Sequence, residues 1–255
     1  MYIDTHCHLH HRKFNKDREQ ILEQMRVYGI EAFIEVPIDF ESNYNMREKI
    51  QQGYFAVGVH PSKTVMIESE DFLQRLKILM TMRNTVAVGE TGLDIRIAEY
   101  EVQEKYFRIF IQMALEYDRP LILHLRGTGT YQRALEILRE YDCTFKGVLH
   151  CFTGDVKDAF RFIELGFHLG IGGLVTYKEN AELRSAVKEI PSERILLETD
   201  SPFLRPETCL EGNRNSPLNI PAIATEIAYI KGIEVQRVAE TTTGNARELF
   251  KLYKV

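Results

Sequence analysis

The chain has 255 residues and a formal net charge of −5, and 44% of its residues are hydrophobic. This length allows a sizeable buried core. The negative charge argues against tight, charge-driven binding to duplex DNA or to anionic membranes. The four cysteines form no C-x-x-C pair, which excludes a zinc ribbon or a disulfide framework. With no signal peptide or membrane-length apolar run, we expect a cytoplasmic protein with no membrane and no obligate protein partner.

Short β-branched runs alternate with amphipathic stretches along the chain. We predict strands over 2–6, 31–36, 54–59, 85–90, 120–124, 145–149, 167–171 and 194–198. We predict helices over 17–28, 41–51, 68–82, 100–117, 130–141, 155–164, 179–188 and 219–231, with one or two more in 234–253. Asp155 and Asn219 are expected to cap helices, and Gly232 is expected to end one.

Eight strands that are each followed by a helix predict an α/β fold, a single (β/α)₈ TIM-barrel domain over residues 1–255. The alternative is a doubly wound open sheet. Such a sheet often carries a glycine-rich phosphate loop after its first strand, and this chain has Thr5-His6-Cys7-His8 at that place. We therefore favour the barrel.

Five of the apolar runs end on residue types that bind metals. These residues are His6 with His8, Glu90, His124, His150 and Asp200. The carboxyl ends of barrel strands meet at one face, so we expect the five ends to converge on one metal site. His6 and His8 are two residues apart and point to the same side of a strand. Imidazole combined with carboxylate suits Zn²⁺, Mn²⁺, Fe²⁺ or Co²⁺.

Structural explanations compete with metal binding for several of these residues. Solvated histidines at a strand end explain an isolated H-x-H pair equally well. His124 and His150 occupy equivalent places on neighbouring strands, which favours metal binding. By contrast, His168 lies inside a strand and is expected to be structural. Asp94 is expected to be a cap or a solvated loop residue.

Three further residues are candidates for the site. Glu198 precedes Asp200 by two residues, and we expect it to orient a ligand while Asp200 binds metal and accepts a proton. His60 ends the third predicted strand. Arg126 follows His124 by two and can bind phosphate or carboxylate, or form a salt bridge at the barrel rim. Glu90 has two carboxylate oxygens and could bridge two metals.

The order of the motifs is more specific than any one of them. They are Asp4-Thr5-His6-Cys7-His8-Leu9, Gly58-Val59-His60-Pro61, Gly89-Glu90-Thr91-Gly92-Leu93-Asp94, His124-Leu125-Arg126, His150-Cys151-Phe152-Thr153-Gly154, Glu198-Thr199-Asp200-Ser201-Pro202, Arg214-Asn215-Ser216-Pro217 and Thr243-Gly244-Asn245-Ala246. Over nearly its whole length the chain resembles the TatD family of metal-dependent deoxyribonucleases. The resemblance implies two divalent cations per chain (Mg²⁺, Mn²⁺ or Zn²⁺). His6, His8, Glu90 and Asp200 would hold one, and Glu90, His124 and His150 the other. It also implies that His60 and Arg126 face the substrate phosphate.

Two loops depart from the family's pattern. The chain has Ile95-Arg96-Ile97 where the family often has an aromatic pair and an arginine. It has Gly127-Thr128-Gly129-Thr130 where many members have an acidic residue and an alanine. Both loops are expected over the barrel mouth, so they bear on substrate choice rather than on metal chemistry.

The expected reaction is hydrolysis of DNA phosphodiester bonds by a hydroxide activated between two metals. The negative charge favours a single-stranded end as substrate, and the relatives suggest exonuclease action in the 3′→5′ direction. Alternatives are deacylation of aminoacyl-tRNA or hydrolysis of a small ester at the same metals, or a non-catalytic nucleic-acid-binding barrel. The complete hydrolytic set argues against the last of these. Phe152, Tyr177 and Phe203 are candidates for base stacking or for core packing.

Overall fold

The computed structural model describes residues 1–67, 71–97, 99–209 and 214–252. Its strands are β1 (Tyr2–Cys7), β2 (Ile30–Glu35), β3 (Tyr54–Val57), β4 (Thr85–Asp94), β5 (Leu121–Arg126), β6 (Gly147–Leu149), β7 (Phe167–Ile171) and β8 (Ile195–Leu197). Its α-helices are α1 (Arg18–Val27), α2 (Ser42–Lys49), α3 (Phe72–Met80), α4 (Tyr100–Glu116), α5 (Thr130–Leu138), α6 (Val156–Glu164), α7 (Ala181–Glu189), α8 (Ile220–Lys231) and α9 (Val235–Phe250). Short 3₁₀ helices cover Arg12–Phe14, Pro61–Met66, Gly173–Thr176, Ser192–Arg194 and Pro217–Asn219. In the described part of the chain, no helix is both long enough and apolar enough to cross a membrane.

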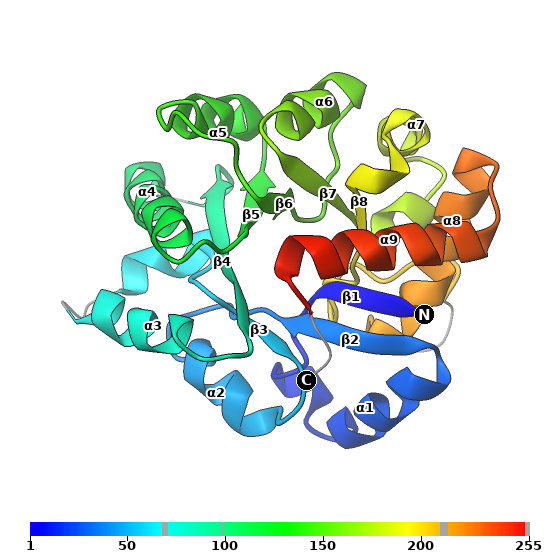
Figure 1. Ribbon diagram of the computed structural model, residues 1–255, viewed down its shortest axis with the longest axis horizontal. Coiled ribbons are helices and arrows are strands. Elements are labelled where there is room, and N and C mark those ends of the chain that lie inside the picture. Colours follow the sequence, from blue (N-terminus) through cyan, green and yellow to red (C-terminus); the bar gives the residue numbers. More distant parts are fainter. Residues whose placement is uncertain (68–70, 98, 210–213, 253–255) are drawn as a thin grey trace.

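The eight strands form one parallel sheet in sequence order, β1 to β8, and helices α1 to α8 surround it (Figure 1). The two edge strands meet through hydrogen bonds just beyond their ends. Cys7 and Ser201 form a parallel bridge, and the Asp200 amide donates to the His6 carbonyl at 2.8 Å. The buried Asp4 carboxylate accepts from both the amide and the hydroxyl of Thr199, at 3.0 and 2.6 Å. The predicted (β/α)₈ barrel is therefore confirmed.

All the predicted strands and helices are present, and most of their ends differ by only a few residues. The predicted helix 68–82 is observed as α3, and its residues 68–70 lie outside the described residues, as does residue 253 of the last predicted segment. The Asp155 carboxylate caps α6 by accepting from the Asp158 amide at 2.8 Å, as predicted. Gly232 ends α8 with a φ of 65°, also as predicted.

The predicted cap at Asn219 is wrong. A 3₁₀ helix leads directly into α8, so Asn219 already has helical backbone angles, with φ −88° and ψ −3°. The capping position moves back to Ser216, whose hydroxyl accepts from the Leu218 amide. The Asn219 side chain instead donates to the Asn215 side-chain oxygen at 2.9 Å.

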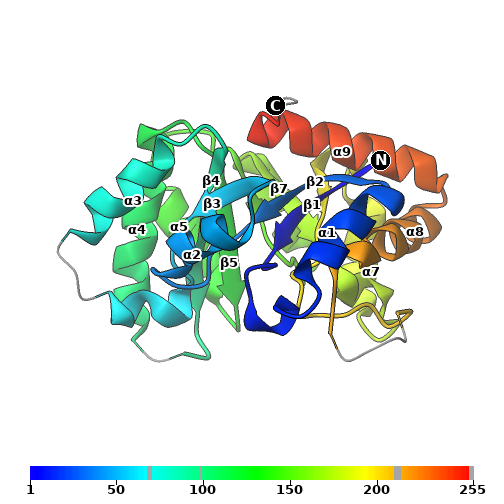
Figure 2. The same cartoon turned by 90° about the horizontal axis from the view of Figure 1, so that it is seen from below.

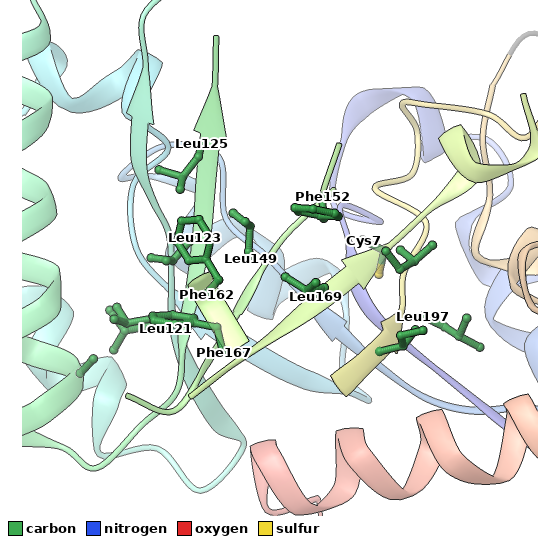
Figure 3. Close-up of a cluster of buried hydrophobic side chains, with 14 of the residues drawn as sticks. Cys7, Leu121, Leu123, Leu125, Leu149, Phe152, Phe162, Phe167, Leu169 and Leu197 are labelled. Atoms are coloured by element: carbon green, nitrogen blue, oxygen red, sulfur yellow. The ribbon is translucent and has the colours of Figure 1, made fainter. Parts of the chain in front are cut away.

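The sheet is buried on both faces, which explains why its strands are nearly continuous apolar runs. On β5, the alternate residues Leu121, Leu123 and Leu125 belong to the core between the strands and the helices (Figure 3). Ile122 belongs to a second core inside the barrel. His124 is two residues further along β5 and points to the same side as Ile122.

Helix α9 closes the amino end of the barrel. Its Ala246, Leu249 and Phe250 pack with Ile122 and Val148 in the interior core. In Figure 2 the N-terminus lies beside α9, and the arrowhead of β1 points away from that helix. The amino end of the barrel is therefore filled with apolar side chains, which leaves the carboxyl end for a site.

Candidate metal centre

The first group of predicted ligands meets where β1 ends and the chain leaves β8. His6 Nε2 lies 3.3 Å from His8 Nε2 and 3.5 Å from Glu90 Oε2. Asp200 Oδ1 lies 3.2 Å from His8 Nε2 and 3.9 Å from His6 Nε2. His6, His8 and Asp200 thus surround one small volume, and Glu90 adjoins it through His6. The Asp200 side chain is 14% exposed, whereas those of His6, His8 and Glu90 are 1–3% exposed, so Asp200 has the best access to solvent.

The second group meets on the other carboxylate oxygen of Glu90. His124 Nδ1 lies 2.5 Å and His150 Nε2 lies 3.6 Å from Glu90 Oε1. The His6 and His150 rings stack with centroids 3.6 Å apart, which joins this group to the first. Glu90 therefore lies between two sets of histidines and offers each set one oxygen.

Hydrogen bonds away from the centre determine which nitrogen of two histidines faces it. The His8 Nδ1 atom lies 2.7 Å from the Val36 carbonyl oxygen. A carbonyl only accepts, so Nδ1 carries a proton in either charge state of the ring, and Nε2 is the nitrogen that faces the centre. In the same way His124 Nε2 faces the Asp94 carboxylate at 3.4 Å, which leaves Nδ1 toward Glu90. Partners of this kind orient metal-binding histidines in general.

Glu198 lies behind His150. Its Oε1 is 3.0 Å from His150 Nδ1, without the alignment of a hydrogen bond, and accepts from the Cys151 amide at 2.6 Å. Burial raises the pKa of this carboxyl to about 7. Gly170 on β7 makes room for the group, since an added Cβ would overlap Glu198 Oε2.

Asp94 is buried, so the predicted solvated loop residue is wrong, whereas its carboxylate does accept from the Arg96 amide at 3.0 Å in the turn that follows. β4 continues four residues past its predicted end, and Asp94 is 1% exposed at the end of the strand. Arg96 pairs with both of its carboxylate oxygens, at 2.9 and 2.6 Å. Burial alone would raise the pKa of Asp94, but the hydrogen bonds from Arg96 and His124 lower it. The carboxylate stays ionised beside His124.

Two glycines allow β4 to lie close to β5 on either side of Glu90. Gly89 and Gly92 have φ values of 150° and 141°, which residues with a side chain rarely adopt. A Cβ at Gly89 would lie 2.6 Å from the Ile122 carbonyl oxygen, and one at Gly92 would overlap the His124 carbonyl. The close approach places Glu90 opposite His124 of β5 and His150, which follows β6.

The electrostatic field at the centre favours a cation. Burial lowers the pKa of His8, but the Asp200 and Glu90 carboxylates more than reverse this and raise it to about 9. Burial raises the pKa of Asp200, but the hydrogen bond from His8 and the other imidazoles lower it to about 2. A field that attracts a proton so strongly also attracts a divalent ion. Nitrogen and carboxylate donors in this arrangement fit Zn²⁺ or Mn²⁺, and the carboxylates also suit Mg²⁺.

His60 and Arg126 lie beside the donors. His60 Nδ1 accepts from the Ser62 amide at 3.1 Å, so Nε2 carries the proton and points to Glu90 Oε1 at 3.9 Å. Burial lowers the pKa of His60 to about 4, which keeps the ring neutral. Arg126 donates to the Leu125 carbonyl at 2.9 Å, and no carboxylate of the described residues lies within 4.0 Å of its guanidinium. The salt bridge considered for Arg126 is therefore absent from this part of the chain.

Glu35 is a structural residue of the site that the sequence analysis missed. Its fully buried carboxylate accepts from the Leu9 amide at 3.0 Å and from the His10 amide at 2.7 Å. It also pairs with the His10 ring at 2.6 Å, so His10 is a buried loop residue. These bonds hold the turn that follows His8. The signal was available, because the run Ala32-Phe33-Ile34 ends on Glu35 just as the other five runs end on polar residues.

The three candidate aromatic residues differ in exposure. Phe152 is 1% exposed and belongs to the core between strands and helices (Figure 3). The Tyr177 hydroxyl donates to the Arg205 carbonyl at 3.0 Å. Phe203 is 39% exposed, and its ring lies edge-to-face on His8 with centroids 5.9 Å apart. Phe203 alone of these three combines exposure with contact to a predicted ligand.

Comparison with known proteins relates this geometry to a family. The family of TatD-related DNases matches residues 3–251. The chain is 34% identical to the uncharacterized metal-dependent hydrolase YabD of Bacillus subtilis, over 99% of this chain and 100% of that protein. It is 30% identical to the 3′-5′ ssDNA/RNA exonuclease TatD of a Rahnella species, over 94% of both chains. The crystal structure of YjjV, a TatD homologue from Escherichia coli, superposes with a TM-score of 0.89 at 28% identity, covering 99% of this chain and 98% of that one.

Proposed function

Because this chain belongs to the TatD-related DNase family of metal-dependent hydrolases, we propose that it hydrolyses phosphodiester bonds in DNA, removing nucleotides from single-stranded 3′ ends. The observation that carries the proposal is the convergence of six donor side chains with little exposure, Glu90 among them, at the carboxyl end of the barrel. A centre with this density of lone pairs and negative charge serves to hold cations rather than to stabilise the barrel.

Two cations are proposed, with Glu90 shared between them. His6, His8, Glu90 and Asp200 would hold one ion, and Glu90, His124 and His150 the other. The observation in favour is that Glu90 presents Oε2 to His6 and Oε1 to His124 and His150. When bound, the cations would supply Lewis acidity and lower the pKa of a coordinated water towards ~7.

Asp200 is the proposed proton acceptor. Its carboxylate is ionised at neutral pH and is the most exposed of the first group of ligands. A water molecule that enters from the barrel mouth would meet this carboxylate first. Asp200 can orient such a water and take its proton as the water attacks phosphorus.

His60 and Arg126 are the proposed contacts to the scissile phosphate. His60 offers a neutral N–H, because its other ring nitrogen accepts from Ser62. The Arg126 guanidinium is partly buried and forms no salt bridge with a carboxylate of the described residues. Its charge is therefore available to a phosphate. Donors of these two kinds stabilise the negative charge that grows on the phosphate oxygens in the transition state.

Phe203 is the proposed stacking surface for the terminal base. Its exposed ring lies against His8 and His11, and the Lys13 ammonium is 5.7 Å from the ring centroid. Stacking a base on an aromatic ring contributes ~1–3 kcal/mol and tolerates any sequence. A strand end would thus be held beside the first group of ligands.

The test is a metal-dependent nuclease assay. Metal-free protein would receive Mg²⁺, Mn²⁺ or Zn²⁺ and a single-stranded oligonucleotide labelled at its 5′ or its 3′ end. We expect a ladder of shortened 5′-labelled products and immediate release of the 3′ label. Asp200→Asn should reduce the rate by about 10³-fold or more, whereas Asp118→Asn, on the exposed surface, should leave it unchanged.

Two outcomes would contradict the proposal. One is the absence of shortening with every metal although about two ions remain bound per chain, as measured by mass spectrometry of the metals. The other is shortening that persists at full rate in Asp200→Asn. Asp200-dependent cleavage of aminoacyl-tRNA or of a small ester, without cleavage of DNA, would instead support the deacylase or esterase alternative.

A further inference from the structure

A cavity of about 470 Å³ opens next to the metal centre, between the loops that follow β5 and β6. Its lining includes Arg126, Thr128, Tyr131, Thr153, Asp158 and Arg161. Arg126 follows the ligand His124 by two residues, and Thr153 follows the ligand His150 by three. The cavity therefore begins where the two ligand-bearing strands end.

The charged lining of this cavity is mainly cationic. Arg126 lies on the side nearer the metal centre and has no carboxylate partner among the described residues. Arg161 reaches the cavity from α6, donates to the Gln132 side chain and lies 3.6 Å from Asp158 Oδ1. Two guanidinium groups thus face one carboxylate, and Arg126, on the side nearer the metal centre, would be shared between the scissile phosphate and an anion in this cavity.

The loop Gly127-Thr128-Gly129 adds backbone donors to the lining. Gly129 occupies the N-cap of α5 with a φ of 83° and offers no side chain to bond the first N–H groups of that helix. The neighbouring helix α6 differs, because the Asp155 carboxylate caps its first turn. Of the two helices that begin at this cavity, only α5 has a cap without a side chain, and Gly129 and Tyr131 both line the cavity. An anion near these N–H groups would also be favoured by the helix dipole.

Gly127 carries no side chain, and its backbone conformation disfavours a residue that has one. Gly127 has a φ of 98°, and a Cβ added there would overlap Ile95 Cγ2. The two loops in which this chain departs from its family's pattern are therefore in contact with each other. The consequence is that no side chain from position 127 competes for the Arg126 guanidinium.

We propose that this cavity binds a second phosphate group of the substrate, the one next to the phosphodiester that is cleaved. The proposal rests on the proposed function, because neighbouring phosphates on one strand are what an oligonucleotide presents and a small ester lacks. Planar guanidinium groups with backbone N–H donors match the tetrahedral oxygens of phosphate. The Tyr131 ring stacks on Phe152 at an interplanar angle of 14°, which gives the cavity a rigid wall.

The test is equilibrium binding of nucleotides with one or two phosphates to the metal-loaded protein. Isothermal titration calorimetry would compare thymidine 3′,5′-bisphosphate with thymidine 3′-monophosphate and thymidine 5′-monophosphate. We expect the bisphosphate to bind at least about tenfold more tightly than either monophosphate.

Position 128 offers a matched pair of variants, because Thr128 is exposed and outside the proposed catalytic machinery. Thr128→Asp introduces a carboxylate into the cavity and should remove the advantage of the bisphosphate. Thr128→Asn has the same shape without the charge and should keep it. Arg161→Gln should reduce the advantage several-fold, and each variant's fold would be checked by its melting temperature.

Equal affinity for the bisphosphate and the monophosphates would overturn the proposal, as would equal effects of Thr128→Asp and Thr128→Asn. The oligonucleotide assay separates this failure from failure of the proposed function. Shortening of DNA without a bisphosphate advantage leaves the nuclease and removes the subsite. A bisphosphate advantage that depends on Thr128 and Arg161, without any shortening of DNA, keeps the subsite and removes the nuclease.

Discussion

His8 and His168, at opposite ends of the barrel, lie in opposite electrostatic surroundings. At the carboxyl end, burial lowers the pKa of His8, but the carboxylates beside it raise the value to about 9. Toward the amino end, His168 pairs in register with Val148, and burial lowers its pKa to about 4. One histidine lies in a field that attracts cations, and the other is held neutral. The difference shows that carboxylates are concentrated beside His8, at the carboxyl end of the barrel.

The difference between the two ends is visible along a single strand. On β5, Ile122 belongs to the interior apolar core, and His124 is the next residue on the same side of the strand. The amino end gains stability from burying apolar area. The carboxyl end instead holds Glu90, Asp94 and Asp200 with little exposure, an arrangement that costs stability unless cations are bound. We therefore expect substitutions at the carboxyl end to change activity, and those at the amino end to change stability.

The largest expected effect is at the carboxyl end. Glu90→Gln keeps the shape of the side chain but removes the charge that both groups of histidines share. We expect kcat/KM to fall by about 10³-fold or more, equivalent to ~4 kcal/mol, together with loss of bound metal. Unchanged metal content and activity would disprove the central role of Glu90.

The matching change at the amino end is Phe250→Ala. The side chain of Phe250 is buried between α9 and the interior core, and its loss should cost ~3–5 kcal/mol of unfolding free energy in urea titrations. kcat per folded molecule should stay within about twofold of the wild type, since the metal centre is at the other end. Phe250→Leu should cost only ~1–1.5 kcal/mol. A fall in kcat as large as that of Glu90→Gln would mean that the two ends are coupled.

Asp94→Asn tests whether a residue behind the proposed ligands contributes to metal affinity at the carboxyl end. Asp94 faces His124 Nε2 at 3.4 Å, and the substitution removes the charge while the side chain keeps its size. We expect metal affinity to fall by ~10–100-fold in competition with a chelating dye. Arg96→Gln should have a smaller effect in the same direction, because the side chain of Arg96 is 63% exposed. If neither variant changes metal affinity, Asp94 serves only the loop that follows it.

The smallest expected effect is the pH dependence from His168. Its pKa is about 4 in the folded protein, below the usual 6.5, so the unfolded chain takes up this proton first as the pH falls. The contribution of the neutral His168 ring to the free energy of unfolding is fully present above pH 6.5 and is lost as the pH falls towards 4. The pKa shift of His168 by itself corresponds to ~3 kcal/mol of unfolding free energy. Partial exposure of the ring to solvent reduces this contribution to ~1–2 kcal/mol. Urea titrations of metal-free protein at pH 7 and pH 4.5 should show a smaller loss for His168→Gln than for the wild type. An equal loss would assign the dependence to other groups.

The barrel and the candidate ligands were predictable because their signals are local. Strand period, helix period and loop length are properties of neighbouring residues, and they placed all eight strands and the helices that follow them. In a barrel the carboxyl ends of all the strands lie at one face. Residues such as His124 and His150 could therefore be assigned to that face before any contact was known. The capping of α6 by Asp155 depends on three consecutive peptide units and could likewise be predicted from the sequence.

By itself the sequence determined the fold class and brought six donor side chains to one end of the barrel. Only the tertiary structure decided which nitrogen of His8 and His124 faces that centre, because this depends on Val36 and Asp94 from other strands. It alone placed Glu35 under His10, and Ile95 against Gly127 beside the cavity. The physical reason is that such contacts depend on the register between strands and on the paths of loops, whereas periodicity reports only which side of its own strand a residue occupies.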